Sequence, residues 1–121
     1  MPGADLDLLR GTLDLLVLRA LAADPQHGFG VARWIRQVTH DDIRIEDAAL
    51  YTSLHRLEQR GAVKSEWATT PNNRRAKYYA LTPAGRRALT QESARWTAYA
   101  AAVFRVLKTQ REAIRLLEQM G

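Results

Sequence analysis

The chain has 121 residues, 46% hydrophobic and 26% charged, which corresponds to one globular domain rather than to a multidomain enzyme. Its 18 Lys and Arg outweigh 13 Asp and Glu, and the net charge of +5 favours an anionic partner such as nucleic acid. The absence of cysteine excludes disulfides, thiolate nucleophiles and cysteine-based metal centres. The longest apolar run, Ala98–Phe104, is too short to span a membrane. Asp5 and Asp7 stand where a secretory signal would carry cations, so we expect a cytoplasmic protein without a membrane partner.

A leucine-rich segment, residues 6–23, predicts a first helix with two apolar stripes. The residues of one stripe are Leu6, Leu9, Leu13, Leu16, Val17 and Ala20. The residues of the other are Leu8, Leu15, Leu18 and Ala22. Only Asp7, Arg10 and Asp14 remain as a polar strip, so one domain core cannot cover both stripes. We therefore expect this helix to pack on its own domain with one side and on another long helix with the other.

The next segment is expected to hold a turn, a short helix and a short strand. Asp24–Pro25 ends the first helix, and His27–Gly30 predicts a tight turn into a second helix over Val31–Val38. After a polar break, Ile43–Ile45 predicts a short strand.

A third helix is predicted from Glu46–Asp47 to about Arg60, with Gly61 at the position of a left-handed C-cap. Its buried face is marked by Leu50, Leu54 and Leu57. The opposite face gathers small or hydrogen-bonding side chains, with Tyr51 at its boundary: Ala48, Thr52, His55, Arg56 and Gln59. Such a face suits entry into the major groove of DNA.

Alternating patterns over residues 62–68 and 76–81 predict two strands of a hairpin. The connection between them, Thr69–Arg75, is rich in turn formers. Three cations, Arg74, Arg75 and Lys77, follow the tip. Cationic turns are more often solvated surface than binding sites, but after a hairpin in this element order we favour phosphate contact.

The last predicted helix starts with Thr82 as N-cap and Pro83 in the first turn, and continues to about Met120. It follows a heptad pattern in which seven of nine seam residues are apolar. The two seam positions are occupied by Leu89, Trp96, Val103, Gln110 and Leu117, and by Ser93, Ala100, Leu107 and Ile114. A seam of this length indicates a helical partner, so we expect a homodimer.

This order of elements predicts a mainly α-helical fold with a small β-hairpin, a winged helix-turn-helix with an appended dimerisation helix. We assign residues 1–82 to a winged-helix DNA-binding domain and residues 83–121 to a C-terminal dimerisation helix, together forming one compact unit. The predicted partners are double-stranded DNA and a second copy of the chain.

The sequence also resembles the PadR family of bacterial transcriptional regulators, especially short members with one C-terminal helix. The resemblance covers about residues 6–110. Its motifs are Leu9–Leu13, His27–Gly30, Ala49–Tyr51 with Leu54–Glu58, Asn73–Tyr79 and Leu81–Gly85. It implies a dimeric DNA-binding repressor on an inverted repeat, which in some members also binds aromatic or drug-like effectors at the dimer interface. Thr52 stands where members commonly have proline.

From the residues and the resemblance together we assign DNA contact to the third helix and the hairpin. The residues assigned are Ala48, Tyr51, Thr52, His55, Arg56, Asn73, Arg74, Arg75 and Lys77. Two roles stay open for Tyr51, which either contacts a base or phosphate or fills the gap between the third helix and the hairpin.

Trp96 is first a packing residue, but the small Ser93 and Ala100 beside it would leave an uneven seam. A planar aromatic effector is therefore a secondary hypothesis, with an apolar pocket lined by Leu8, Leu15, Trp96, Ala100 and Val103. Trp34 and Trp67 are assigned to packing.

No catalytic constellation, metal site or cofactor site is predicted. His40 beside Asp41 and Asp42 is a poor metal candidate, because three adjacent residues cannot easily surround one ion. The chain offers no paired nucleophile and base, so an enzyme is disfavoured. The alternative function is a protein–protein interaction module that uses the long helix and does not bind DNA.

Overall fold

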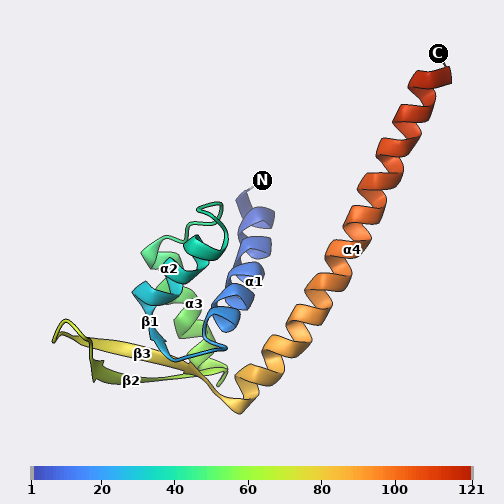
Figure 1. Ribbon diagram of the computed structural model, residues 1–121. Coiled ribbons are helices and arrows are strands. Elements are labelled where there is room, and N and C mark those ends of the chain that lie inside the picture. The colour runs from blue at the N-terminus through green and yellow to red at the C-terminus, as the bar shows by residue number, and fades with distance from the viewer. Residues whose placement is uncertain (1, 121) are drawn as a thin grey trace. The chain divides into compact units, whose positions relative to one another are not determined.

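The computed structural model describes the backbone of residues 2–120 and the side chains of residues 11–108 and 115–120. Within the described residues, four helices and three strands follow one another (Figure 1). They are α1 (Pro2–Ala20), β1 (Gln26–His27), α2 (Gly28–Val38), α3 (Asp47–Gln59), β2 (Val63–Thr69), β3 (Arg75–Leu81) and α4 (Pro83–Met120). This mainly helical chain with its small sheet confirms the predicted fold class.

The chain divides into two units, residues 1–89 and 90–121, with the division inside α4. In the first unit α1, α2 and α3 group together, and the β2–β3 hairpin extends beyond them (Figure 1). Their core is aliphatic, and its largest side chains with almost no exposed surface are Val17, Leu18, Leu21, Val31, Ile35, Leu50, Leu54 and Leu57. Ala88 and Leu89, in the first turns of α4, pack against this core.

The sheet is antiparallel in the order β1-β3-β2. The two long strands form the predicted hairpin, with Val63 opposite Leu81 at its base and Thr69 opposite Arg75 near its tip. The predicted strand at Ile43–Ile45 is wrong, because that segment is irregular. The third strand is Gln26–His27, which pairs with Tyr79 and Tyr78 on the other edge of β3.

The tight turn expected at His27–Gly30 is also corrected, because α2 already begins at Gly28. The His27 imidazole acts as its N-cap: Nδ1 accepts a hydrogen bond from the Gly30 amide at 3.0 Å. This bond satisfies one of the free amides in the first helical turn. Local hydrogen bonding therefore sets the start of α2 three residues before the apolar pattern suggests.

A buried carboxylate joins α1 to α3. Asp14, predicted on a polar strip, is only 6% exposed. Its Oδ1 accepts hydrogen bonds from the Ser53 hydroxyl at 2.5 Å and from Nη2 of Arg56 at 2.6 Å, and Oδ2 accepts from Nε of Arg56 at 3.2 Å. The polar strip is therefore not exposed at Asp14, because α3 covers that side of α1 and supplies donors for the carboxylate.

The end of α3 is connected to the start of α4 by hydrogen bonds. Gly61 follows α3 with φ +76°, as predicted for a left-handed C-cap. The Thr82 hydroxyl donates to the Gly61 carbonyl at 2.6 Å and accepts from the Gly85 amide at 3.0 Å. The predicted N-cap role of Thr82 is confirmed, and the same side chain also binds the C-terminal turn of α3.

The remainder of α4, which is 38 residues long in all, forms the second unit. Along it large apolar side chains are exposed to solvent, among them Tyr99, Phe104, Val106, Leu107, Leu116 and Leu117. The side chains of Gln110 and Ile114, two residues of the predicted seam, lie outside the described residues. The predicted helix is thus confirmed, while its pairing with a second helix stays a prediction.

Candidate nucleic-acid interface

The predicted reading face of α3 is exposed. Ala48, Tyr51, Thr52 and His55 all face solvent, while Leu50, Leu54 and Leu57 point into the core. The Thr52 hydroxyl donates to the Ala48 carbonyl at 2.8 Å. Its proton is therefore engaged within the helix, and toward an external partner Thr52 presents an acceptor oxygen and a methyl group.

Arg56 differs from the other α3 residues predicted to contact DNA. Its guanidinium is bound to the Asp14 carboxylate by two hydrogen bonds, and 28% of its side chain is exposed. The structure gives Arg56 a role in holding α3 against α1. Its assignment to DNA contact stays a prediction.

We call the β2–β3 hairpin, residues 63–81, the wing. Its tip is an ordered turn. The Thr70 amide donates to the Arg74 carbonyl at 2.7 Å, and the Asn73 amide donates to the Thr70 carbonyl at 2.9 Å. Asn73 has φ +62°, a left-handed conformation that asparagine tolerates better than most residues. The side chains of Arg74 and Arg75 are exposed at this tip. Lys77, further from the tip, lies 3.9 Å from Glu58 on α3.

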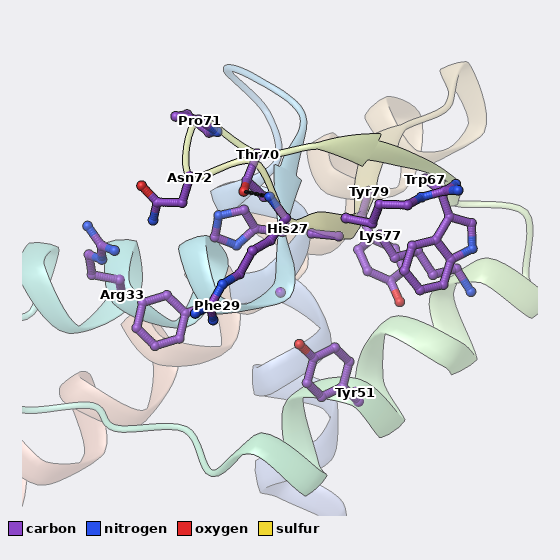
Figure 2. Close-up of a pocket in the computed structure, with 14 residues that line it drawn as sticks. His27, Phe29, Arg33, Tyr51, Trp67, Thr70, Pro71, Asn72, Lys77 and Tyr79 are labelled. Atoms are coloured by element: carbon purple, nitrogen blue, oxygen red, sulfur yellow. Dashed lines mark hydrogen bonds between the residues drawn. The ribbon is translucent and has the colours of Figure 1, made fainter.

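A cleft of about 820 Å³ separates the wing from α2 and α3. Figure 2 shows Phe29 and Arg33 on one side of it and Trp67, Lys77 and Tyr79 on the other, with Tyr51 between them in this view. The other residues that line it are His27, Gly28, Thr70, Pro71, Asn72, Arg74, Arg75 and Ala76. Among these described lining residues four are Lys or Arg and none is acidic. The cleft is therefore suited to an anionic partner.

Tyr51 is positioned by a glycine of α2. A Cβ atom on Gly28 would lie 2.8 Å from the Tyr51 ring, so this close approach requires glycine. Gly61 is the only glycine with positive φ in the described part of the chain, so the reason for glycine at position 28 is this close approach and not a left-handed backbone. Tyr51 thus packs on α2, yet its side chain is 48% exposed and lines the cleft.

Tyr79 is a buried residue of the cleft lining. Burial, followed by the charges of Glu58 and Tyr51, raises the pKa of the Tyr79 hydroxyl above its ordinary value. The ammonium of Lys77 lies 5.8 Å from the centre of the Tyr79 ring. Lys77 is therefore held between an aromatic ring and the Glu58 carboxylate.

Two exposed aromatic residues of the cleft were missed as candidate binding residues. Trp67, assigned to packing, is 60% exposed, and the guanidinium of Arg75 lies 5.8 Å from its ring centre. The strand alternation places Trp67 on the same face as Val63, but β2 extends past the core before Trp67 is reached. Phe29 is 63% exposed, with Arg33 at 5.2 Å from its ring centre. Trp34, in contrast, packs against the core as expected.

The residues predicted to line an effector pocket belong to different units. Leu15 is half-buried on α1 in the first unit, whereas Trp96, Ala100 and Val103 lie in the second. Trp96 is 46% exposed. The side chain of Leu8 lies outside the described residues.

The three-helix core, the exposed face of α3 and the cationic hairpin define a winged helix-turn-helix protein. The Transcriptional regulator PadR-like family model matches residues 17–91. The chain belongs to this family, whose members are DNA-binding transcriptional regulators rather than enzymes. The resemblance seen in the sequence is thereby confirmed.

Individual relatives agree with this assignment. The chain is 34% identical to Transcriptional regulator Rv3488 of Mycobacterium tuberculosis over 84 residues, which are 69% of this chain and 74% of the relative. A PadR family transcriptional regulator from Eggerthella lenta is 33% identical, with a TM-score of 0.72 over 89% of this chain and 92% of the other. The transcriptional regulator Cth-833 from Clostridium thermocellum is 28% identical, with a TM-score of 0.73 over 80% and 94% of the two chains.

Two further features concern membranes and metals. Within the described residues, no helix combines the length and apolarity needed to cross a bilayer. Across the same part of the chain, no three His, Asp or Glu side chains gather as metal ligands would.

Proposed function

We propose that the chain acts as a homodimeric repressor that binds an inverted-repeat DNA operator in a sequence-specific manner. The observation that carries this proposal is the cleft beside the exposed face of α3, whose described lining holds four cations and no acidic residue. Phosphates of the DNA backbone are the anions that such a surface beside a recognition helix attracts. A dimer occupying an operator would exclude other proteins from the same stretch of DNA, which is the simplest route to repression.

In this proposal α3 enters the major groove and supplies sequence discrimination. Its candidate base-contacting residues are Ala48, Tyr51, Thr52 and His55, which lie on the exposed face in the first two turns and the middle of the helix. Phosphate contacts fix position, whereas contacts to base edges specify sequence. The Arg56 side chain is 28% exposed while it stays bound to Asp14, and we propose that this exposed part contacts a phosphate.

The wing supplies the sequence-independent part of the affinity. Asn73, Arg74, Arg75 and Lys77 are its proposed contacts to the backbone or to an adjacent minor groove. The exposure of Arg74 and Arg75 supports this role. Lys77 would exchange its contact with Glu58, 3.9 Å away, for a phosphate.

Dimerisation is proposed through the apolar residues of α4 together with Leu15 of α1. Two other residues of the second stripe, Leu18 and Ala22, pack in the domain's own core instead. The exposed side chains of Phe104, Leu107 and Leu117 support it, because a helix with such residues along its length gains stability by pairing. A symmetric dimer presents two copies of α3 related by a two-fold axis. The matching DNA site is therefore an inverted repeat.

A planar aromatic effector bound near Trp96 is the secondary part of the proposal. The half-exposed indole, with Ala100 one turn away, supports it. An effector would alter DNA affinity only if it bound one geometry of the dimer more tightly than another.

Selection from a randomised duplex library tests the proposal, followed by fluorescence anisotropy of the selected duplex over a range of salt concentrations. We expect an enriched inverted repeat and an affinity that falls steeply with salt. Sedimentation at micromolar concentration should give a single species of twice the chain mass. Self-association without any DNA affinity would instead support the interaction-module alternative, and a monomer that binds single half-sites would reject the dimer.

A further inference from the structure

We propose that two aromatic–arginine pairs, Phe29 with Arg33 and Trp67 with Arg75, form a clamp for the sugar–phosphate backbone of one DNA strand. The clamp rests on the proposed function, since it describes how the cleft between the wing and α2 would be occupied in the complex. It adds two apolar contacts, Phe29 and Trp67, to a surface otherwise described by its cations.

The two pairs have the same construction on different elements. Phe29 and Arg33 are one turn apart on α2, and the guanidinium lies 5.2 Å from the ring centre. Trp67 on β2 and Arg75 on β3 lie on the same face of the hairpin, with 5.8 Å between guanidinium and ring centre. Figure 2 shows Phe29 and Trp67 on opposite sides of the opening. The cleft thus has one exposed ring and one arginine on each side.

The exposure of these rings calls for a partner. Phe29 and Trp67 are 63% and 60% exposed, although each has a large apolar surface that water solvates poorly. An arginine stacked on each ring covers part of that surface without closing the cleft. A single exposed apolar residue is ordinary surface, but two exposed rings that line the same cationic cleft favour a shared binding site.

The chemistry of the lining selects the partner. Arg33, Arg74, Arg75 and Lys77 line the cleft, and none of its described lining residues is acidic. A DNA strand presents anionic phosphates alternating with deoxyribose rings, whose carbon faces are apolar. A ring beside an arginine matches one sugar and its neighbouring phosphate, because the stacked guanidinium keeps its N–H edges free to donate. The cleft carries one aromatic–arginine pair on each side, and a DNA strand repeats a sugar followed by a phosphate, so the two pairs can bind successive sugar–phosphate units.

Measuring the Kd of the full chain for DNA at several salt concentrations separates the apolar contribution to the binding free energy from the ionic contribution. With the selected duplex, Trp67→Ala and Phe29→Ala should each raise Kd about 10- to 100-fold, since each removes one apolar contact from both subunits of a dimer. Their log–log salt slopes should equal that of the parent protein. Arg33→Ala should also weaken binding, but it should flatten the slope by about 2 for the dimer. Val38→Ala, an exposed apolar residue of α2 outside the cleft lining, is the matched control and should leave Kd unchanged.

Fluorescence places the contact at the ring itself. In the double variant Trp34→Phe and Trp96→Phe, Trp67 is the only tryptophan, and we expect its emission to shift to shorter wavelength as DNA saturates the protein. The matched variant that retains only Trp34 should show no such shift. Circular dichroism of each variant confirms that it is folded before binding is compared.

Several outcomes would overturn the clamp while leaving the proposed function intact. One is parental affinity of Trp67→Ala and Phe29→Ala for a duplex that the parent protein binds tightly. Another is Trp67 emission that does not respond to DNA, or that shifts with protein concentration alone, which would assign the cleft to a second copy of the chain. Failure of the parent protein to bind any duplex is a different result, because it rejects the proposed function and the clamp with it.

Discussion

Replacing Asp14 with alanine tests how α3 is held in place. The carboxylate is buried between α1 and α3, where it accepts hydrogen bonds from Ser53 and Arg56. Alanine leaves two groups without their acceptor: a Ser53 hydroxyl with no exposed surface and an Arg56 side chain that is 28% exposed. We expect the variant to be markedly less stable than the parent protein.

The magnitude follows from the two orphaned donors. An unsatisfied buried hydroxyl costs about 1–3 kcal/mol. Breaking a buried ion pair costs about 3–5 kcal/mol, but the Arg56 side chain is partly exposed and can recruit water, which lowers its share to about 2 kcal/mol. With about 1 kcal/mol for the hydroxyl, the expected loss is about 3 kcal/mol. Arg60, 3.9 Å from Asp14 and half exposed, adds about zero. Removing the orphaned hydroxyl as well, in Asp14→Ala with Ser53→Ala, should restore about 1 kcal/mol.

Urea unfolding and thermal melts at one fixed protein concentration measure the effect, because the stability of a dimer depends on concentration. A loss of about 3 kcal/mol corresponds to a Tm lowered by about 12–24 °C for a folding unit the size of residues 1–89. Asp24→Ala, at an exposed position after α1, is the control and should stay within about 0.5 kcal/mol of the parent. Equal stabilities of the Asp14 and Asp24 variants would refute the argument.

Four further predictions concern DNA and ligand binding. Arg74→Ala should weaken binding to all duplexes alike and flatten the log–log salt slope by about 2 per dimer in anisotropy titrations; an unchanged slope in a folded variant would remove Arg74 from the backbone contacts. In competition assays, Thr52→Ala should change the difference in binding free energy between two half-sites by about 1–3 kcal/mol, and a preserved ranking of half-sites would show that the sequence is read by other residues. Gly28→Ala should lower DNA affinity at nearly parental Tm, because the new Cβ would displace the flexible end of Tyr51, 2.8 Å away; parental affinity would contradict a role for that ring position. Trp96→Phe should abolish saturable fluorescence quenching by a planar aromatic dye, and quenching that persists in this variant would exclude the proposed effector site.

The helices and the hairpin were predictable because their signals are local. Thr82 and Gly61 carry capping chemistry, and the alternation along β2 and β3 is regular. The strand β1 was not predictable, because two residues are too few to show a periodic pattern. Gln26 and His27 form a strand only because they pair with the edge of β3. The Ile43–Ile45 segment has strand propensity but no such edge. Pairing between residues more than 50 positions apart decided this part of the sheet.

In the candidate interface, too, features set by local sequence were predicted, and features set by tertiary contacts were not. The exposed face of α3 follows from helical periodicity around Leu50 and Leu54, which is why its residues were found. The burial of Asp14 was not predicted, because no local rule reveals that Ser53 and Arg56, about 40 positions away, supply its donors. Trp67 looked buried because large aromatic residues in strands usually are, and only the length of β2 beyond the core exposes it.

The Thr82 side chain connects the C-terminal end of α3 to the N-terminal end of α4. Its hydroxyl binds the Gly61 carbonyl after α3 and the Gly85 amide in the first turn of α4, so a single oxygen fixes both. The Thr82 amide also donates to the Ala62 carbonyl at 3.1 Å. A tilt of the first turns of α4 therefore cannot occur without either breaking these bonds or turning the C-terminal end of α3 with it. We therefore expect the C-terminal end of α3 and the first turn of α4 to move together about the hydrogen-bonded Gly61–Thr82 contact.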